Sequence, residues 1–455
     1  MIIFGAGPAG FSTALSLPKS IKVLLVEAGD INYSEASQVF YDGKVIGDKY
    51  FDLKDCRLRQ LGGSSNHWTG KCRTLDTFDF AYKDYAKNAN WPIAKSDLQN
   101  YLMPACNLLK IKSNFHSKPY QWDKHVEELD FQFSPVMFKF NYLNNVAESH
   151  DIDLIVNAAI TKAHIKSDAI HELTITNKVG ENKTIQAHHY VFAMGGIENG
   201  RMLKFLAKDN PNSSLSKNPN VGAYWMEHPH YCVGDYFYNL PDHDRWYVGI
   251  SEVKKRSLNV LNCNLNFASQ LKHPEDGKIK KLLRDLICAD EAIGSEVSYG
   301  LGRNYCGGEI DAAWEQAPDF DNRIDLATDV DAFGTPKAVL NWHKSDLDLR
   351  TIRLTAEYVA ESMVKYKHAK IRLREWLWSG NYPENGQIAG MHHMGGTRMS
   401  ASPKDGVVNP DLRCWDVSNL YMAGSSVFPS SGHANPTLTI VQLAVRLAEH
   451  IAKQA

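Results

Sequence analysis

The chain lacks several features that mark whole classes of protein. It contains no CxxC pair, which disfavours zinc sites, iron–sulfur clusters and disulfide reductases, and we predict no metal. No apolar run is long enough to cross a bilayer, and a formal net charge of −2 gives no electrostatic reason to bind nucleic acid or an anionic membrane. The eight cysteines are scattered, and we interpret them as reduced cytoplasmic thiols: Cys56, Cys72, Cys106, Cys232, Cys263, Cys288, Cys306 and Cys414.

Little else in the composition is unusual. With 455 residues, of which 44% are hydrophobic and 22% charged, the chain is long enough for two or three globular domains. It has no internal repeat and no low-complexity tract. A β-prone segment and a glycine turn begin almost at once, so we expect no signal peptide. Because so few residues precede the first glycine, it stays open whether a few native residues are missing.

The N-terminus carries a dinucleotide-binding pattern. Apolar residues 2–4 are followed by three glycines in GxGxxG spacing, a helix-forming stretch at 8–17 and a β-prone segment at 21–26 that ends at Glu27. The glycines are Gly5, Gly7 and Gly10. Such glycines let the backbone approach a pyrophosphate at a helix N-terminus, and the acidic residue accepts the ribose hydroxyls. The pattern predicts a dinucleotide site without separating FAD from NAD.

A second glycine-rich segment spans residues 61–70, Leu-Gly-Gly-Ser-Ser-Asn-His-Trp-Thr-Gly. Its small residues expose backbone N–H groups and leave room for a flat ligand, although a surface turn would use the same residues. His67 could stack on such a ligand, hydrogen-bond to it or attach to it covalently. We expect this segment to contribute five residues to a cofactor site: Gly62, Gly63, Ser64, Asn66 and His67.

Two motifs near the C-terminus suit the oxidation of an alcohol. His392 and His393 lie in Met-His-His-Met-Gly-Gly-Thr-Arg-Met (391–399), and Asn435 lies in Gly-His-Ala-Asn-Pro-Thr (432–437). A neutral imidazole can take an alcohol proton near pH 7, and an amide can donate to the substrate oxygen. Apolar residues then recur at helical spacing, with Asn435 suited to the N-cap and Pro436 to the first helical position. The positive end of that helix would stabilise negative charge on a reduced cofactor.

Taken in order, these motifs resemble those of the glucose–methanol–choline (GMC) oxidoreductases. Trp-Pro-Ile at 91–93, Ala-Met-Gly-Gly-Ile-Glu-Asn at 193–199 and Glu-His-Pro at 227–229 match this family as well. The most similar branch holds the pyranose oxidases and the flavin subunits of sugar dehydrogenases. The resemblance implies FAD, hydride transfer to flavin N5, and a small-molecule alcohol or sugar as substrate. The electron acceptor stays open between oxygen, a quinone and a redox protein.

The resemblance also assigns residues. It places the catalytic base at His392 and the second catalytic residue at Asn435, with His433 and His393 as possible accessory residues. His67 matches the histidine that carries the flavin covalently in pyranose oxidases, but other members bind FAD non-covalently, and we favour non-covalent binding here. The remaining implied cofactor contacts, of which Gly424 replaces a frequently acidic residue, are Ala193, Gly195, Ala423, Gly424, Pro436 and Thr437.

The middle of the chain changes pattern. Residues 153–165, 172–176 and 189–193 are β-prone, whereas the runs 231–238 and 259–267 alternate like antiparallel strands and are interrupted by helical stretches at 278–289 and 346–366. We predict an α/β fold with a discontinuous Rossmann-like FAD-binding domain and an α+β substrate or cap domain on an antiparallel sheet. The first would comprise residues 1–80, 150–224 and 385–455, and the second 81–149 and 225–384. The polar cluster 227–230 would either line the site or form a structural loop.

We therefore predict FAD-dependent oxidation of a CH–OH group, in a sugar or polyol-like alcohol. Two alternatives stay open. One is an NAD(P)H-dependent flavin reductase or monooxygenase, against which the lack of a second GxGxxG motif argues. The other is a flavin subunit that is active only within a multi-protein dehydrogenase.

Overall fold

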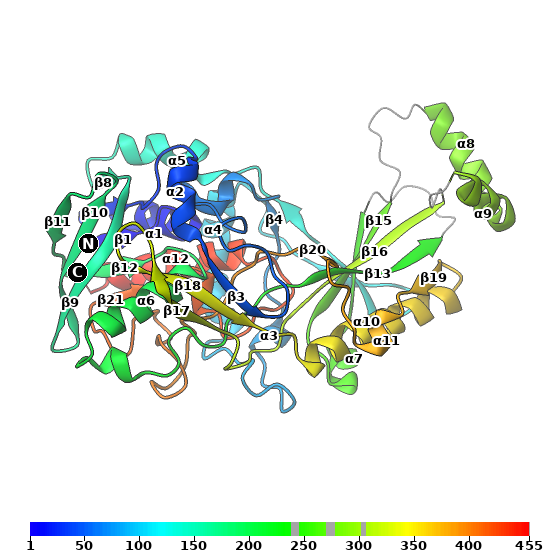
Figure 1. Cartoon of the computed structure of the whole chain (residues 1–455). Helices are drawn as coiled ribbons and strands as arrows, with labels where there is room; N and C mark the ends of the chain where they lie inside the picture. The colour runs from blue at the N-terminus through cyan, green and yellow to red at the C-terminus, as the bar shows by residue number, and fades with distance from the viewer. Residues whose placement is uncertain (238–244, 270–277, 302–305, 455) are drawn as a thin grey trace.

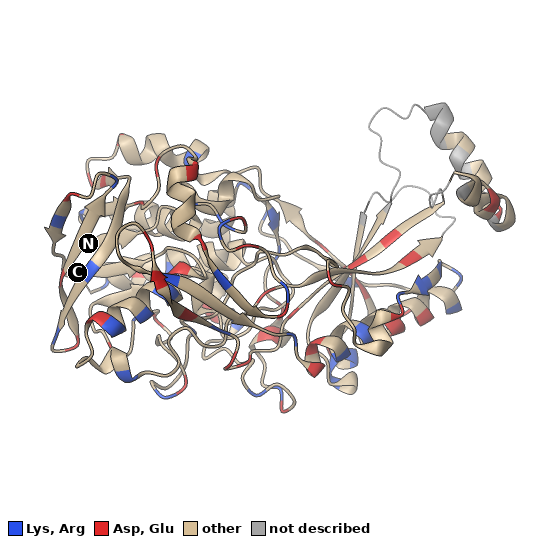
Figure 2. Cartoon of the chain, viewed as in Figure 1, with Lys and Arg blue, Asp and Glu red and all other residues tan. Residues whose placement is uncertain are grey.

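The computed structural model describes residues 1–237, 245–269, 278–301 and 306–454. The chain forms two lobes, and both chain ends lie in the same one (Figure 1). Lys and Arg residues are interspersed with Asp and Glu residues along the ribbon of both lobes (Figure 2). Among the described helices, none has the length and apolar character needed to cross a membrane.

The first lobe is built on a five-stranded parallel sheet in the order β21-β12-β1-β2-β8. Strands β1 and β12 are completely buried and apolar, as expected for a parallel sheet that is covered on both faces. Its strands come from all three predicted segments, which confirms a Rossmann-like domain that is discontinuous in sequence: β1 (Ile2–Phe4), β2 (Val23–Val26), β8 (Ile152–Ile155), β12 (Tyr190–Phe192) and β21 (Leu420–Met422).

Two helices from opposite ends of the chain pack together against this sheet, α1 (Pro8–Ser16) and α12 (Thr437–Ala452). Helix α12 buries one apolar face, which includes Leu438, Val441 and Leu447, as its periodicity predicts. Its N-terminus differs from the prediction: Pro436 occupies the N-cap position, and the side chain of Asn435 makes no cap. That side chain is used elsewhere in the site.

The second lobe is an antiparallel sheet, as predicted. Its order is β19-β13-β16-β15-β14-β6-β5, with β20 also paired to β13. The residue Tyr238 of the predicted strand 231–238 lies outside the described residues. The strands are β5 (Ser117–Pro119), β6 (Val126–Leu129), β13 (His230–Phe237), β14 (Arg245–Ile250), β15 (Cys263–Ser269), β16 (Gly307–Trp314), β19 (Lys370–Leu373) and β20 (Gln387–Ala389).

Helix α10 (Asp346–Lys365) covers one face of this sheet and begins at a capping box between Ser345 and Asp348. Helices α8 (Lys278–Ala289) and α9 (Glu291–Gly300) project from the far end of the lobe (Figure 1). The other helices are α2 (Glu35–Gln38), α3 (Thr77–Phe80), α4 (Leu102–Leu109), α5 (Phe138–Ala147), α6 (Glu198–Asp209), α7 (Glu252–Leu258) and α11 (Trp376–Ser379).

Smaller sheets complete the fold. Strand β3 pairs in parallel with β18, so the sheet β17-β18-β3 joins segments from both predicted domains. The antiparallel sheet β11-β10-β9 and the pair β4–β7 lie apart from it. The strands are β3 (Gly43–Gly47), β4 (Lys71–Cys72), β7 (Gln132–Phe133), β9 (Ala158–Lys166), β10 (Ala169–Asn177), β11 (Asn182–Ile185), β17 (Arg323–Val330) and β18 (Pro336–Trp342).

The predicted segment 81–149 divides between the lobes. Its strands β5 and β6 join the large antiparallel sheet, as the substrate-domain prediction requires. Its helices α4 and α5 instead bury Leu109 and Phe138 in the hydrophobic core of the first lobe, and α4 packs on α12. The difference arises because the apolar faces of these helices match the nucleotide-binding core, which sequence periodicity alone does not reveal.

The prediction that all eight cysteines are reduced is wrong for two of them. Cys288, at the end of α8, forms a disulfide with Cys306, just before β16. The six other cysteines carry free thiols. Scattered spacing gave no sign of this pair, because disulfide pairing depends on the distance between Cα atoms in the fold, here 5.3 Å.

Candidate active site

A cavity of about 620 Å³ extends from the first glycine turn to the face of the antiparallel sheet. Most of the predicted site residues line it: Gly5, Gly7, Glu27, Gly63, Ser64, His67, Ala193, Gly195, His392, His393, Gly424, Asn435, Pro436 and Thr437. Five others do not line it: Gly10, Gly62, Asn66, Ala423 and His433.

The glycines of the first motif have separate roles. A Cβ on Gly7 would meet no atom within 4 Å, so this position faces open space in the cavity. A Cβ on Gly10 would lie 1.9 Å from the carbonyl oxygen of Gly5, so this glycine is needed for packing of the helix on the strand. Gly195, with φ +94°, also faces open space, on the opposite turn. Gly7 and Gly195 thus leave a groove in which a pyrophosphate could approach the backbone.

Glu27 stabilises the backbone beside this groove. Its carboxylate accepts hydrogen bonds from the backbone N–H of Ala6 at 2.9 Å and of Gly29 at 2.8 Å. Each carboxylate oxygen has a second lone pair, so these bonds leave acceptor capacity for ribose hydroxyls. The predicted ribose contact by Glu27 stays a prediction, and the structure adds a role in holding the glycine turn.

In the second glycine segment, the residues that do not line the cavity support those that do. The Asn66 side-chain amide donates to the carbonyl oxygens of Leu61 at 2.9 Å and Gly63 at 2.8 Å. The backbone N–H of Gly62 donates to the carbonyl of Ala6 at 2.8 Å, which ties the two glycine turns together. Asn66 and Gly62 therefore support the loop that lines the cavity, and their contact with a cofactor stays a prediction.

Ala423 is also structural. Its N–H donates to the carbonyl of Phe192 at 2.8 Å, and its own carbonyl accepts a hydrogen bond from Asn199 at 2.9 Å. The next residue, Gly424, lines the cavity with φ +107°, a conformation that favours glycine. The chain therefore turns from the sheet into the cavity between these two residues.

The predicted catalytic pair is assembled as the sequence suggested. Asn435 Nδ2 lies 3.0 Å from His392 Nε2, and both side chains line the cavity. The backbone N–H of His392 donates to Glu227 Oε1 at 2.7 Å. The Tyr50 hydroxyl donates to the other oxygen of the same carboxylate. A buried carboxylate therefore anchors the backbone of the histidine.

The Glu-His-Pro motif supplies a second contact to His392. His228 Nδ1 lies 3.1 Å from His392 Nδ1, and His228 Nε2 lies 3.2 Å from the carbonyl oxygen of Ser431. His230 packs its ring edge-on to His392 with 5.7 Å between ring centroids. Of the cluster 227–230, His230 lines the cavity, whereas Glu227 and His228 contact His392 without lining it.

Burial keeps the histidines of this cluster neutral. Desolvation lowers the pKa of His228 to about 3 and the pKa of His230 to about 4, and neighbouring positive charge lowers both further. The pKa of His392 is held well below 6.5 by burial first and then by charge on His228 and His230. Burial raises the pKa of the Glu227 carboxyl to about 7, against the hydrogen bonds that favour its ionised form. His392 is thus a neutral imidazole, with a single ring N–H, at neutral pH.

The two other predicted histidines differ. His393 Nε2 lies 3.1 Å from the hydroxyl of Tyr50, the same hydroxyl that donates to Glu227. His393 therefore contacts the residues that hold His392, and we do not assign it as the base. His433 is buried away from the cavity, and its Nε2 lies 3.2 Å from Asp76 Oδ2. His433 does not line the cavity, and its accessory role stays a prediction.

Polar side chains of the antiparallel sheet form the floor of the cavity. In the strand register, Asn266 of β15 lies beside Asp311 of β16 and Tyr247 of β14. Two further polar residues line the cavity: Asn264, whose amide donates to the carbonyl oxygen of His433 at 3.3 Å, and His230, whose ring packs on His392. Sequence reasoning missed Asn264, Asn266 and Asp311, although alternation along β15 and β16 places polar residues on one face.

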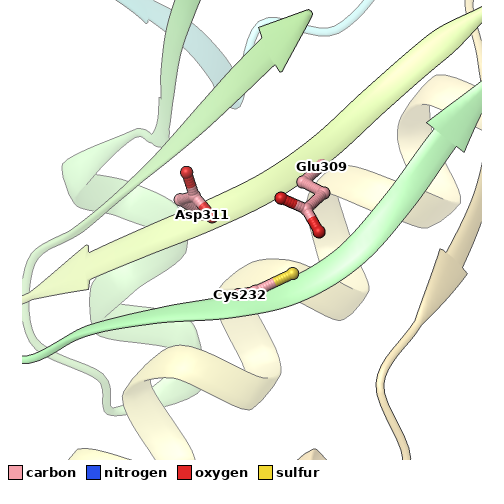
Figure 3. Close-up of side chains that lie close together, drawn as sticks. All are labelled: Cys232, Glu309 and Asp311. Atoms are coloured by element: carbon pink, nitrogen blue, oxygen red, sulfur yellow. The ribbon is translucent and has the colours of Figure 1, made fainter. Parts of the chain in front are cut away.

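Asp311 also belongs to a group that could be taken for a metal site. The ligand atoms of Cys232, Glu309 and Asp311 lie within 4.8 Å of one another, on the adjacent strands β13 and β16 (Figure 3). The guanidinium of Arg374 lies 3.6 Å from the Cys232 sulfur and 3.9 Å from a Glu309 oxygen. Because this cation already serves two of the three groups, we assign no metal here.

A buried cluster of one carboxylate and two arginines also lines the cavity and was not predicted. Glu198 accepts from Arg57 at 2.8 Å and from Arg201 at 2.9 Å, and all three residues are buried. The sequence holds only one weak sign of it, the acidic residue at the start of α6. These contacts join α6 to the segment before the second glycine cluster.

Comparison with known proteins agrees with this geometry. The sequence model of the GMC oxidoreductases matches residues 318–444. The chain is 25% identical to the fructose dehydrogenase large subunit of Gluconobacter japonicus over 69% of its own length and 56% of that subunit. The chain therefore spans little more than half of that relative.

A second relative is matched over more of its length. The chain is 38% identical to the long-chain-alcohol oxidase FAO4A of Arabidopsis thaliana, over 97% of this chain and 67% of the relative. The fold is also that of formate oxidase from Aspergillus oryzae RIB40, with a TM-score of 0.59, 14% identity, and coverage of 100% of this chain and 98% of the other. The parallel sheet, the antiparallel sheet and the C-terminal motifs thus agree with the sequence comparisons, and the chain belongs to the GMC oxidoreductase family.

Proposed function

We propose that this protein oxidises a CH–OH group of a sugar or polyol-like alcohol, with FAD as its cofactor. The observation that carries the proposal is the 3.0 Å pair of His392 Nε2 and Asn435 Nδ2, in the same cavity as the glycine groove. A neutral imidazole beside an amide donor is suited to removing a hydroxyl proton while the oxygen is held.

The groove supports FAD. Gly7 and Gly195 leave open space where a side chain would otherwise lie. FAD modification is described for the formate oxidase that shares this fold. When bound, FAD would supply the hydride acceptor. Gly7, Gly63, Gly195 and Gly424 would hold it, and His67 lines the same cavity. A covalent link through His67 remains the less favoured form of this proposal.

The chain's own residues would manage the proton. Burial keeps His392 neutral by holding its pKa well below 6.5, so one ring nitrogen has a lone pair, and Nε2 is the nitrogen that lies beside Asn435 in the cavity. The Asn435 amide has two N–H groups, so it can donate to the substrate oxygen as the O–H bond breaks. Glu227 fixes the backbone of His392 and keeps this geometry in place.

The floor of the cavity supports a polyhydroxylated substrate over a simple aliphatic alcohol. Asn264, Asn266 and Asp311 all face the cavity from the sheet. Within the described protein, Asn266 Oδ1 is buried and accepts no hydrogen bond. Buried polar atoms are normally paired, and the hydroxyls of a sugar or polyol would pair with this one.

The electron acceptor and the assembly are further proposals. Oxygen, a quinone and a redox protein all stay open, and each can be offered separately to the reduced enzyme. A relative described as a large subunit supports the alternative that this chain works within a multi-protein dehydrogenase. Cytoplasmic location also stays a proposal, against which the Cys288–Cys306 bond counts because disulfides are rare in reducing compartments.

The first experiment is an absorbance spectrum of the purified protein and of its supernatant after acid precipitation. We expect flavin bands that move to the supernatant, as non-covalent FAD requires. A hexitol or D-fructose is then added anaerobically, and bleaching of the flavin reports hydride transfer. Flavin colour left in the pellet would instead favour the covalent link through His67.

Two variants sharpen this test. His392→Ala should keep FAD but lose most flavin reduction by substrate. His171→Gln, at an exposed position on β10, is the matched histidine control and should behave like the wild type. Near-normal reduction in H392A would move the base elsewhere, and bleaching by NADPH instead of alcohols would favour the reductase alternative.

A further inference from the structure

The ring of His228 lies between Ser431 and His392, and His392 in turn lies beside Asn435. These four residues form a row. On one side of His228, its Nε2 lies 3.2 Å from the carbonyl oxygen of Ser431. On the other side, Nδ1 lies 3.1 Å from Nδ1 of His392. The far nitrogen of His392, Nε2, lies 3.0 Å from Asn435 Nδ2. The row therefore begins at a backbone carbonyl and ends at a side-chain amide.

The carbonyl end decides where the protons are. A carbonyl oxygen can only accept, so His228 Nε2 must carry the hydrogen. A buried neutral imidazole has one N–H, so His228 Nδ1 carries a lone pair. His392 Nδ1 must then donate to it, because two facing lone pairs would repel each other. The second nitrogen of the neutral His392, Nε2, is left without a proton.

The amide end agrees with this order of protons. Asn435 Nδ2 has hydrogens and no lone pair to offer, so the contact requires His392 Nε2 to accept. The reverse order of protons would place a lone pair of His228 against the Ser431 oxygen and an N–H of His392 against the Asn435 amide. Neither contact at the ends of the row would then be a hydrogen bond. Each would leave unsatisfied polar groups in a desolvated site, which costs free energy at both ends.

We infer that His228 is a positioning residue that holds His392 in the Nδ1–H tautomer, so that Nε2 is the atom that takes the substrate proton. The inference rests on the proposed function for the reaction, but the tautomer is a property of the protein itself. In the proton transfer, the substrate O–H bond breaks and an Nε2–H bond forms. The Nδ1–H of His392 continues to donate to His228 Nδ1 and helps to stabilise the new imidazolium.

The test uses the FAD-loaded protein labelled with ¹⁵N-histidine. The spectrum of His392→Ala, compared with that of the wild type, identifies the His392 ring nitrogens. We expect a protonated, pyrrole-type Nδ1 and an unprotonated, pyridine-type Nε2 at pH 7. A protonated Nε2 in the wild type would overturn the inference, whether or not any alcohol reduces the flavin.

Two variants of His228 separate positioning from simple packing. His228→Ala removes the acceptor, whereas His228→Asn retains one, because Asn Oδ1 is bonded to Cγ as His Nδ1 is. In H228A we expect a mixed or reversed tautomer and a fall of about tenfold in the rate of flavin reduction at saturating hexitol, with FAD affinity unchanged. In H228N the wild-type tautomer should return, with a rate within about threefold of the wild type.

The outcomes are distinguishable. If no alcohol bleaches the wild-type flavin, the proposed function fails while the ¹⁵N spectrum still reads the tautomer. If H228A keeps the Nδ1–H tautomer of His392, the positioning role of His228 is refuted. If H228A and H228N lose FAD or folding equally, as judged by retained flavin and a thermal melt, His228 acts only in packing and the inference is wrong.

Discussion

Replacement of Gly7 by alanine should separate folding from cofactor binding. The added methyl group would meet no protein atom within 4 Å, and the backbone at Gly7, with φ −90° and ψ −167°, is extended and open to alanine. A Gly-to-Ala change at such a position stabilises a protein by about 0.4–1 kcal/mol, because the unfolded chain loses freedom. The folded apoprotein should therefore be at least as stable as the wild type.

The same methyl group would occupy the groove where a pyrophosphate approaches the backbone. We expect FAD to bind 10- to 100-fold more weakly, which corresponds to about 1.4–2.7 kcal/mol of binding free energy. Stabilisation by FAD at a fixed concentration should fall by a similar amount. Flavin fluorescence during titration of the apoprotein gives the Kd, and urea unfolding with and without FAD gives the stabilisation.

Gly10→Ala is the matched control. Its Cβ would lie 1.9 Å from the Gly5 carbonyl oxygen, so the backbone of the glycine turn or of helix α1 would have to shift. We expect G10A to lose about 3 kcal/mol of unfolding free energy, at the upper end of the range for overpacking. The reasoning is refuted if G7A binds FAD as tightly as the wild type, or if G7A unfolds as readily as G10A.

Three further predictions follow from the buried groups. In Glu227→Gln, which removes the carboxyl with a pKa of about 7 beside His392, the value of kcat/KM should stay flat from about pH 8 to about pH 6 and fall only at lower pH, because the neutral form of His392 is active and burial lowers its pKa well below 6.5; an inflection near 6.5 in the pH–rate profile of this variant would contradict this. Glu198→Ala should cost about 3–5 kcal/mol in urea unfolding, since it leaves Arg57 and a second arginine buried without their carboxylate; a loss below 1 kcal/mol would show that water reaches them. Six thiols should react with a thiol reagent in denaturant without reductant and eight after reduction, because Cys288 and Cys306 are bonded; eight in both conditions would exclude the bond.

The features that could be predicted from the sequence are those encoded by near neighbours. The β1–α1–β2 unit follows from glycine spacing and alternating apolar segments within the first 27 residues. Helices α10 and α12 follow from their periodicity. The pairing of His392 with Asn435 was accessible only because both motifs match a known family in order.

Other contacts join segments that are far apart in the chain and carry no local sign. His228 and His392 are 164 positions apart, and their contact depends on the isolated pairing of Met226 with Met394. Asn66 lies in a cofactor-like motif, yet the fold turns its amide back onto its own loop. Such outcomes are set by tertiary packing, which a single sequence does not show.

The short loop that contains Ser431 and Asn435 contacts the row of histidines at both ends, through a carbonyl and through an amide. Proton handling thus depends on one C-terminal loop, whereas the polar floor that would meet the rest of the substrate comes from β15 and β16. Proton transfer and contact with the rest of the substrate therefore use different segments of the chain. Redesign of substrate preference can therefore proceed by exchange of side chains on these two strands, while any insertion in the loop would disturb acid–base chemistry for every substrate alike.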